Sequence, residues 1–115
     1  MKQIMFITFF FLTSLSFAKD VPTVAEYKEN RDNTKFDGYL YGLENGLDWA
    51  SEYAFRKHDM SLFCKPKDIM LPSNEIKKMI DEELNMRDSF YSKYKDEPLI
   101  GLALRNSFAR NFPCN

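Results

Sequence analysis

Apolar residues at helical spacing mark one long segment in the first half of this chain. They recur at steps of three and four residues, as in a helix with one buried face, and they are Phe36, Tyr39, Leu40, Leu43, Leu47, Ala50 and Ala54. The basic residues 56–58 follow, where they suit the negative end of the helix dipole. We therefore predict one long helix that runs to about Phe55 and frays through residues 56–58.

Glycine recurs every fourth residue within this segment, at Gly38, Gly42 and Gly46. Residues four apart lie on one face of a helix, so the three glycines form a stripe. Each costs about 1 kcal/mol relative to alanine, which favours a stripe against which another backbone or a large side chain packs closely. The alternative is a locally weak helix. Together with Tyr39, the glycines are predicted to serve helix packing and not binding.

Two more helices are predicted in the second half of the chain. Ser73 is expected to cap the first, because a serine oxygen can accept from a free N–H of the first turn. The apolar face that follows consists of Ile76, Met79, Ile80 and Leu84. Asp96–Pro98 has the acidic residue and first-turn proline that begin a helix. This last helix is apolar nearly all round, and we expect it to be the most buried.

The remaining segments are less regular. Residues 19–33 are expected to be loosely ordered, apart from a short helix that Thr23 would cap, and Asn33 or Thr34 can cap the long helix. Residues 86–97 mix aromatic and charged side chains, and either extend the second helix or form the turn after it. No segment alternates like a strand. The fold class is therefore predicted to be all-α, a small bundle of three to four helices.

Residues 1–18 have the pattern of a secretory signal peptide. Lys2 gives a positive start, residues 4–12 are apolar except for Thr8, and Ala18 ends a small-residue cleavage site. A membrane-spanning helix needs about 20 apolar residues, and Lys19 ends this run too early. We expect export and a single mature domain of residues 19–115, with an uncleaved anchor as the alternative.

Composition limits the class of partner. The net charge of −1 at pH 7 disfavours nucleic acid and anionic membranes as partners. Aromatic residues make up 16% of the chain, more than so small a core can hold, and some are expected on the surface, where aromatics anchor protein partners.

Two cysteines, Cys64 and Cys114, lie in the predicted mature part. In an oxidising compartment an even pair in a small domain is most simply a disulfide. Closing a loop of about 50 residues would stabilise the domain by about 4 kcal/mol in the chain-entropy model. A thiol nucleophile or a metal ligand is the disfavoured alternative.

No catalytic, metal or cofactor site is predicted. His58 is the single histidine, and its neighbour Asp59 does not make a triad by adjacency, because a nucleophile and a base must meet in space. The acids Glu44 and Asp48, and the acidic run 81–83, fall on faces that the apolar pattern leaves to solvent. Binding is therefore favoured over turnover.

Several motifs, in order, resemble a known family. Residues 38–50 read GYLYGLENGLDWA, Phe63–Pro66 read FCKP, a Ser-capped helix follows, and Asn111–Cys114 read NFPC. This order is similar to the Rap/Tai family of periplasmic immunity proteins, which neutralise peptidoglycan amidases delivered by type VI secretion. The resemblance covers roughly residues 34–115.

The resemblance implies a periplasmic protein that occludes the active site of a cognate effector, and it implies a homodimer as a further assembly. Many members have an additional cysteine before the Gly-Tyr pair, where this chain has Phe36 and Asp37, so only the Cys64–Cys114 pairing carries over. Residues 86–97 are the expected contact element, with the partner-binding residues Asp88, Tyr91, Tyr94, Lys95 and Asp96. An ordinary solvated helix end is the alternative for these five.

Two other functions are weighed against immunity. A small exported acid-stress chaperone would have the same size, helical content and single disulfide. A small exported hydrolase would depend on His58.

Overall fold

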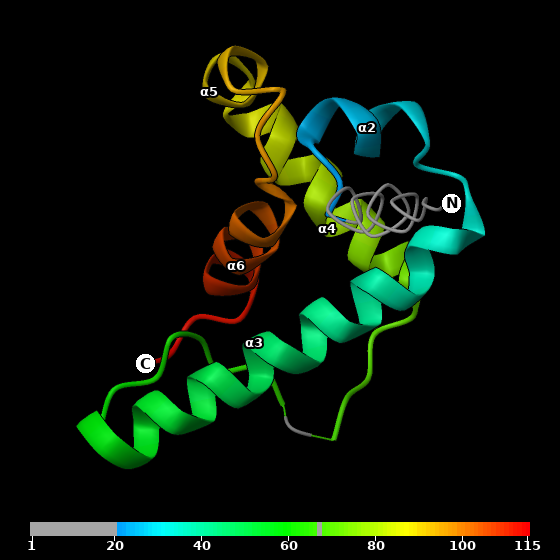
Figure 1. Cartoon of the computed structure of the whole chain (residues 1–115). Coiled ribbons are helices and arrows are strands. Elements are labelled where there is room, and N and C mark those ends of the chain that lie inside the picture. Colours follow the sequence, from blue (N-terminus) through cyan, green and yellow to red (C-terminus); the bar gives the residue numbers. More distant parts are fainter. Residues whose placement is uncertain (1–20, 67) are drawn as a thin grey trace, which may run out of the picture.

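The computed structural model describes residues 21–66 and 68–115, so the predicted signal peptide and its cleavage site lie outside the described residues. The described chain is helical without strands, which confirms the all-α prediction (Figure 1). Its elements are α2 (Val24–Glu29), the 3₁₀ turn η2 (Thr34–Phe36), α3 (Asp37–His58), α4 (Ser73–Met86), α5 (Asp88–Lys93) and α6 (Ile100–Asn111). The segment 86–97 thus forms a short helix of its own.

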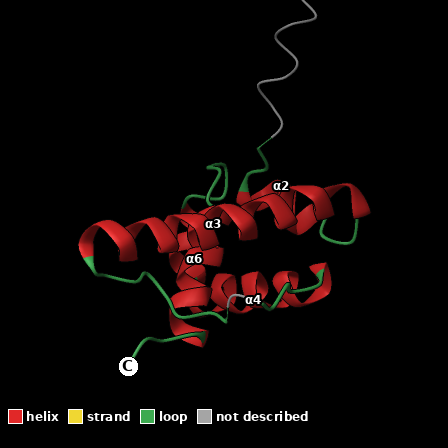
Figure 2. Ribbon diagram, turned by 90° about the horizontal axis from the view of Figure 1, so that it is seen from below, coloured by secondary structure: helices red, strands yellow, loops and turns green. Residues whose placement is uncertain are grey.

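The core lies where α4 packs along α6, with α3 crossing both (Figures 1 and 2). Its fully buried members include Leu40, Ile76, Ile80, Ile100, Leu104 and Phe108. The last turns of α3 extend past the other helices in both views. The connection to α4 begins at this end of α3 and runs back toward the other helices.

The first helix is fixed more firmly than its sequence indicated. Thr23 caps α2 as predicted, in a reciprocal capping box with Glu26. The Val24 and Ala25 N–H groups donate to the Glu97 and Lys95 carbonyls, at 3.1 and 2.9 Å. These bonds pair α2 with the segment that precedes α6, so residues 21–33 are part of the folded unit.

Helix boundaries differ from the predictions at two caps. Pro72, not Ser73, is the N-cap of α4, and the Ser73 N–H donates to the Tyr41 hydroxyl at 3.1 Å. The last helix begins at Ile100, with Leu99 as its N-cap, and not at Pro98. Asn33 does cap the start of the η2–α3 segment by accepting from the Lys35 N–H.

The predicted role of the glycine stripe is wrong. Gly38, Gly42 and Gly46 are exposed, and a Cβ built on any of them would have no heavy atom within 4 Å. The stripe lies opposite the buried face of α3, so no part of the described chain approaches it. Tyr39 does pack against the core. The one close approach is at Gly101, where a built Cβ would lie 3.4 Å from Leu43 Cδ1.

Among residues 21–66 and 68–115, no helix combines the length and the apolar character that crossing a bilayer requires.

Candidate protein-binding surface

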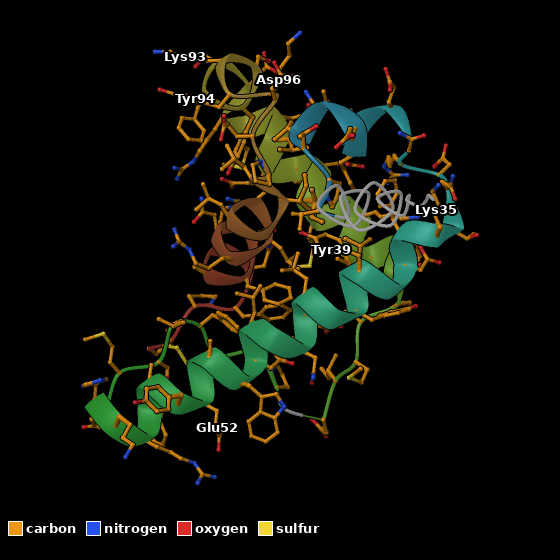
Figure 3. The ribbon with its side chains drawn as sticks, in the orientation of Figure 1. Lys35, Tyr39, Glu52, Lys93, Tyr94 and Asp96 are labelled. Carbon is orange, nitrogen blue, oxygen red and sulfur yellow. A yellow bond between two sulfur atoms is a disulfide. The ribbon has the colours of Figure 1, made fainter. Side chains whose placement is uncertain are left out.

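The predicted contact residues gather at the α5 end, but not all of them face outward. Asp88, Tyr94, Lys95 and Asp96 are exposed, and Figure 3 shows Tyr94 and Asp96 beside α5 at the edge of the molecule. Tyr91 is fully buried, so its predicted role as an exposed anchor is wrong. The prediction failed because α5 starts a new helix, which turns Tyr91 toward the core.

The Tyr91 hydroxyl donates to Glu83 Oε2 at 3.0 Å. Glu83 also accepts from Asn106 Nδ2 at 3.2 Å and from Arg110 Nη1. Burial raises the pKa of Glu83, but these hydrogen bonds and the charge of Arg110 outweigh it, so the pKa lies below its usual range. Burial and the contact with Glu83 raise the pKa of Tyr91 to about 12. Glu83 was expected in solvent and is instead the centre of a buried polar network.

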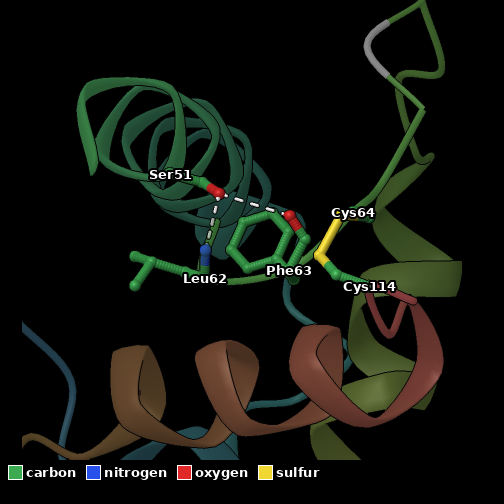
Figure 4. The surroundings of a disulfide bond; sticks show 5 residues. All are labelled: Ser51, Leu62, Phe63, Cys64 and Cys114. Carbon is green, nitrogen blue, oxygen red and sulfur yellow. Dashed lines mark hydrogen bonds between the residues drawn. A yellow bond between two sulfur atoms is a disulfide. The ribbon is translucent and has the colours of Figure 1, made fainter. Parts of the chain in front are cut away.

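The disulfide Cys64–Cys114 is formed, which confirms the predicted pairing (Figure 4). The Cys64 N–H donates to the Phe112 carbonyl at 2.7 Å. The Phe63 ring, beside Cys64, packs edge-on against Phe108 with ring centroids 5.1 Å apart. The connection between α3 and α4 is therefore joined covalently and by packing to the end of α6.

Ser51 fastens the same connection to α3. Its hydroxyl accepts from the Leu62 N–H at 3.2 Å and donates to the Phe63 carbonyl at 3.3 Å (Figure 4). Ser51 is buried, and its hydroxyl thus holds two successive residues of the connection against α3.

Lys65 belongs to this connection, and its buried side chain pairs with two acids of α3. Its Nζ lies 3.1 Å from Glu44 Oε2 and 3.0 Å from Asp48 Oδ2, and it donates to the Ile69 carbonyl at 2.9 Å. Burial lowers the pKa of Lys65, but the hydrogen bonds and the charges of Asp48 and Glu44 outweigh it and the pKa is raised. The predicted solvent position is wrong for Glu44, which is fully buried.

A groove of about 700 Å³ opens above this ion pair, between α3 and the connection. Trp49, Phe55 and Met70 are among its apolar lining residues, and 64%, 53% and 67% of their surfaces are exposed. Tyr53, Met60 and Leu62 add exposed apolar surface on the same helix end and connection. We call these six residues and the groove the α3 surface.

The α3 surface was not located from the sequence, although a surplus of surface aromatics was predicted. One signal was available. Trp49 and Tyr53 follow Gly46 at steps of three and four residues, so they share the glycine face, which lies opposite Leu40 and Leu47.

The α3 surface is a candidate for contact with another protein. Exposed aromatic and methionine side chains are typical of protein interfaces. Both cysteines are oxidised, and the described residues contain no group of three His, Cys, Asp or Glu side chains that could hold a metal ion. His58 lies at the last residue of α3 and is exposed.

Comparison of the chain with family models, with curated proteins and with solved structures found no match.

Proposed function

We propose that this protein is a periplasmic immunity protein that binds a cognate type VI secretion effector and occludes its active site through the α3 surface. The observation that carries the proposal is the cluster of exposed apolar side chains on a backbone fixed by a disulfide, by Ser51 and by the buried Lys65 pairs. The resemblance of residues 38–50 and of the FCKP and NFPC segments to immunity proteins supports a peptidoglycan amidase as the effector.

The mechanism proposed is inhibition without turnover. The end of α3 extends beyond the other helices, as an element that enters a partner's cleft must. Large apolar anchors such as Trp49 supply most of the binding free energy at protein interfaces. A connection held at several points loses little conformational entropy on binding, which favours high affinity.

The direct experiment uses the product of a neighbouring amidase-like gene as the toxin. Cells that export this toxin should survive when the protein is co-expressed, and the two should co-purify from the periplasm. If the toxin kills equally well with the protein present, the immunity proposal fails for that pair.

Rescue assays with amino-acid substitutions then show which surface contacts the toxin. Trp49→Ala combined with Met70→Ala should abolish rescue while the melting temperature stays within a few degrees of the wild type. Val21→Ala is the control, because Val21 is 53% exposed but lies outside both the α3 surface and residues 86–97. Tyr94→Ala combined with Asp96→Ala tests the α5 end. If only this pair abolishes rescue, the contact element is residues 86–97 and not the α3 surface.

An acid-stress chaperone is the second candidate, and the buried carboxylates favour it. Protonation of the buried carboxylate of Glu83 in acid would remove its ion pair to Arg110 and expose apolar surface. Dye binding and client aggregation between pH 2 and 7 separate the candidates. Client protection that starts only in acid, without toxin binding, would favour the chaperone. A cell-wall hydrolase activity that is lost in His58→Ala would instead make the protein an enzyme.

A further inference from the structure

A second cleft, of about 610 Å³, lies between α5 and α6 and shares no lining residue with the groove of the α3 surface. Its polar lining comes from Arg87, Ser89, Arg105 and Asn106, and its apolar lining includes Phe90 and Leu102. Two arginines thus line the cleft and no carboxylate does. The cleft is a cationic site with an apolar wall.

The carboxylate behind the cleft does not cancel this charge. Glu83 is fully buried, and Arg110 Nη1 contacts its Oε1. Its Oε2 accepts from the Tyr91 hydroxyl and from Asn106 Nδ2. The Nε of Arg87 lies 3.4 Å from that oxygen, and 61% of the Arg87 side chain is exposed. Arg110 and Arg87 thus both pair with Glu83, and Arg105 adds a further positive charge to the cleft.

The guanidinium of Arg105 is held by a neutral side chain, that of Asn106. Its Nε and Nη2 donate to Asn106 Oδ1 at 3.3 and 2.9 Å, and the Asn106 amide is held in turn by Glu83. Among the described residues Arg105 forms no ion pair. The carboxylate of the nearby Asp88 accepts from Ser92 and does not line the cleft. A guanidinium held by a neutral amide keeps its full charge for an incoming anion.

We propose that this cleft binds a carboxylate attached to an apolar group, with the carboxylate on Arg105 and Arg87 and the apolar group against Phe90 and Leu102. A guanidinium pairs well with a carboxylate because its fork of N–H donors matches two oxygens. Phe90 is 41% exposed and its ring is held edge-on to Tyr91, with centroids 5.1 Å apart, so it offers a fixed wall. The apolar wall favours an organic carboxylate over inorganic phosphate.

This chemistry is found in a free acylated amino acid and at the C-terminus of a peptide. The test is a titration of the ¹⁵N-labelled protein followed by NMR of the backbone amides of α5 and α6 and of the arginine Nε–H groups. The probes are N-acetylphenylalanine and an alanine pentapeptide that ends in phenylalanine, each compared with its C-terminal amide. Inorganic phosphate tests the need for the apolar group.

The free acids are expected to give saturable shifts at the cleft, and the amides to bind at least about tenfold more weakly, because a hydrogen bond to a charged group is lost. Saturation by the pentapeptide acid assigns a peptide C-terminus, and saturation by N-acetylphenylalanine alone assigns a small acylated amino acid. Arg105→Gln should weaken binding by about tenfold or more. Arg56→Gln is the matched control, since Arg56 pairs with Glu52 on α3, outside the cleft.

Shifts that are equal for acid and amide, or that persist unchanged in Arg105→Gln, would overturn the proposal, as would the absence of saturable shifts with both acids. Phosphate binding as strong as that of the acids would overturn the role of the apolar wall. These outcomes do not depend on toxin neutralisation, so the cleft and the immunity proposal fail separately.

Discussion

The ammonium of Lys65 and the carboxylate of Glu44 meet at 3.1 Å in the interior, where their side chains are 1% and 0% exposed. Glu44 also accepts from the Leu71 N–H at 3.1 Å. Glu44 therefore holds the connection between α3 and α4 against α3 at two points, Lys65 and Leu71. The shape of the groove depends on a buried charge pair.

Replacing Lys65 with methionine should lower the free energy of unfolding by about 3 kcal/mol, because it leaves the Glu44 charge buried without its partner. Urea unfolding at pH 7 measures this loss. The double variant Lys65→Met/Glu44→Leu should recover most of it, since an apolar pair replaces the ionic one. Arg56→Gln, at an exposed pair with Glu52, should change stability by less than about 1 kcal/mol. A Lys65→Met variant as stable as the wild type would contradict the role given to the pair.

Removing the disulfide by Cys64→Ser/Cys114→Ser should lower the free energy of unfolding by about 4 kcal/mol, because the unfolded chain regains the freedom of a loop of about 50 residues. Chemical denaturation of the two forms gives the difference. Mass spectrometry of the exported wild type should find the mature chain two hydrogens lighter than the reduced chain. Free thiols at both positions in exported protein would refute the bond.

Glu83 makes stability depend on pH in a defined direction. Its pKa is lower in the folded protein than in the unfolded chain, so its contribution is fully present above the unfolded value of about 4.3. That contribution is lost as the pH falls through the lower, folded pKa. Urea midpoints measured from pH 7 to pH 2 should therefore fall most steeply below about pH 4.3.

The variant Glu83→Gln isolates this effect. It should be less stable than the wild type at pH 7, because Arg110 loses its charged partner, and its stability should change less with pH in the acid range. Glu82→Gln is the neighbouring control, since Glu82 is exposed. Parallel pH curves for the wild type and Glu83→Gln would show that other carboxylates control acid unfolding.

Gly42→Ala should raise the free energy of unfolding by about 0.5–1 kcal/mol, because alanine favours the helix and its Cβ meets no neighbour. Thermal unfolding measures the gain. Gly101→Ala is the contrast, since its Cβ would press on Leu43 and the gain should be smaller or reversed. Destabilisation by Gly42→Ala would mean that a partner, such as a second copy of the chain, packs on the stripe in solution. Sedimentation of both variants tests that case and the homodimer that the resemblance implies.

The structure could be predicted from the sequence where a local pattern determines it. Helical periodicity located α3, α4 and α6. The expected cap at Thr23 located α2, and the pairing of the two cysteines followed from their number and the predicted compartment. The sequence was insufficient where a residue's position depends on a partner distant along the chain. Glu44 and Glu83 are buried because Lys65 and Arg110 reach them, and a polarity pattern assigns both acids to solvent.

The α3 surface was missed for the same reason, since its exposure depends on how distant segments pack. Periodicity fixes which residues share a face of α3, but not which face the rest of the chain covers. The glycines were therefore assigned to packing, and their face, with Trp49 and Tyr53, was not recognised as exposed. Tyr91 was misassigned for a related reason, because the break between α4 and α5 at Arg87 changes which side chains point inward.

The hydrogen bonds from α2 to residues 95–97 have a consequence for how the chain matures. The helix that is synthesised first finds its partners in a segment synthesised near the end, and Cys64 must likewise wait for Cys114. Most of the polypeptide therefore emerges before either closure can occur. During that interval the apolar face of α4, which packs against α6, lacks cover, so the unfinished chain exposes apolar surface that the finished domain buries.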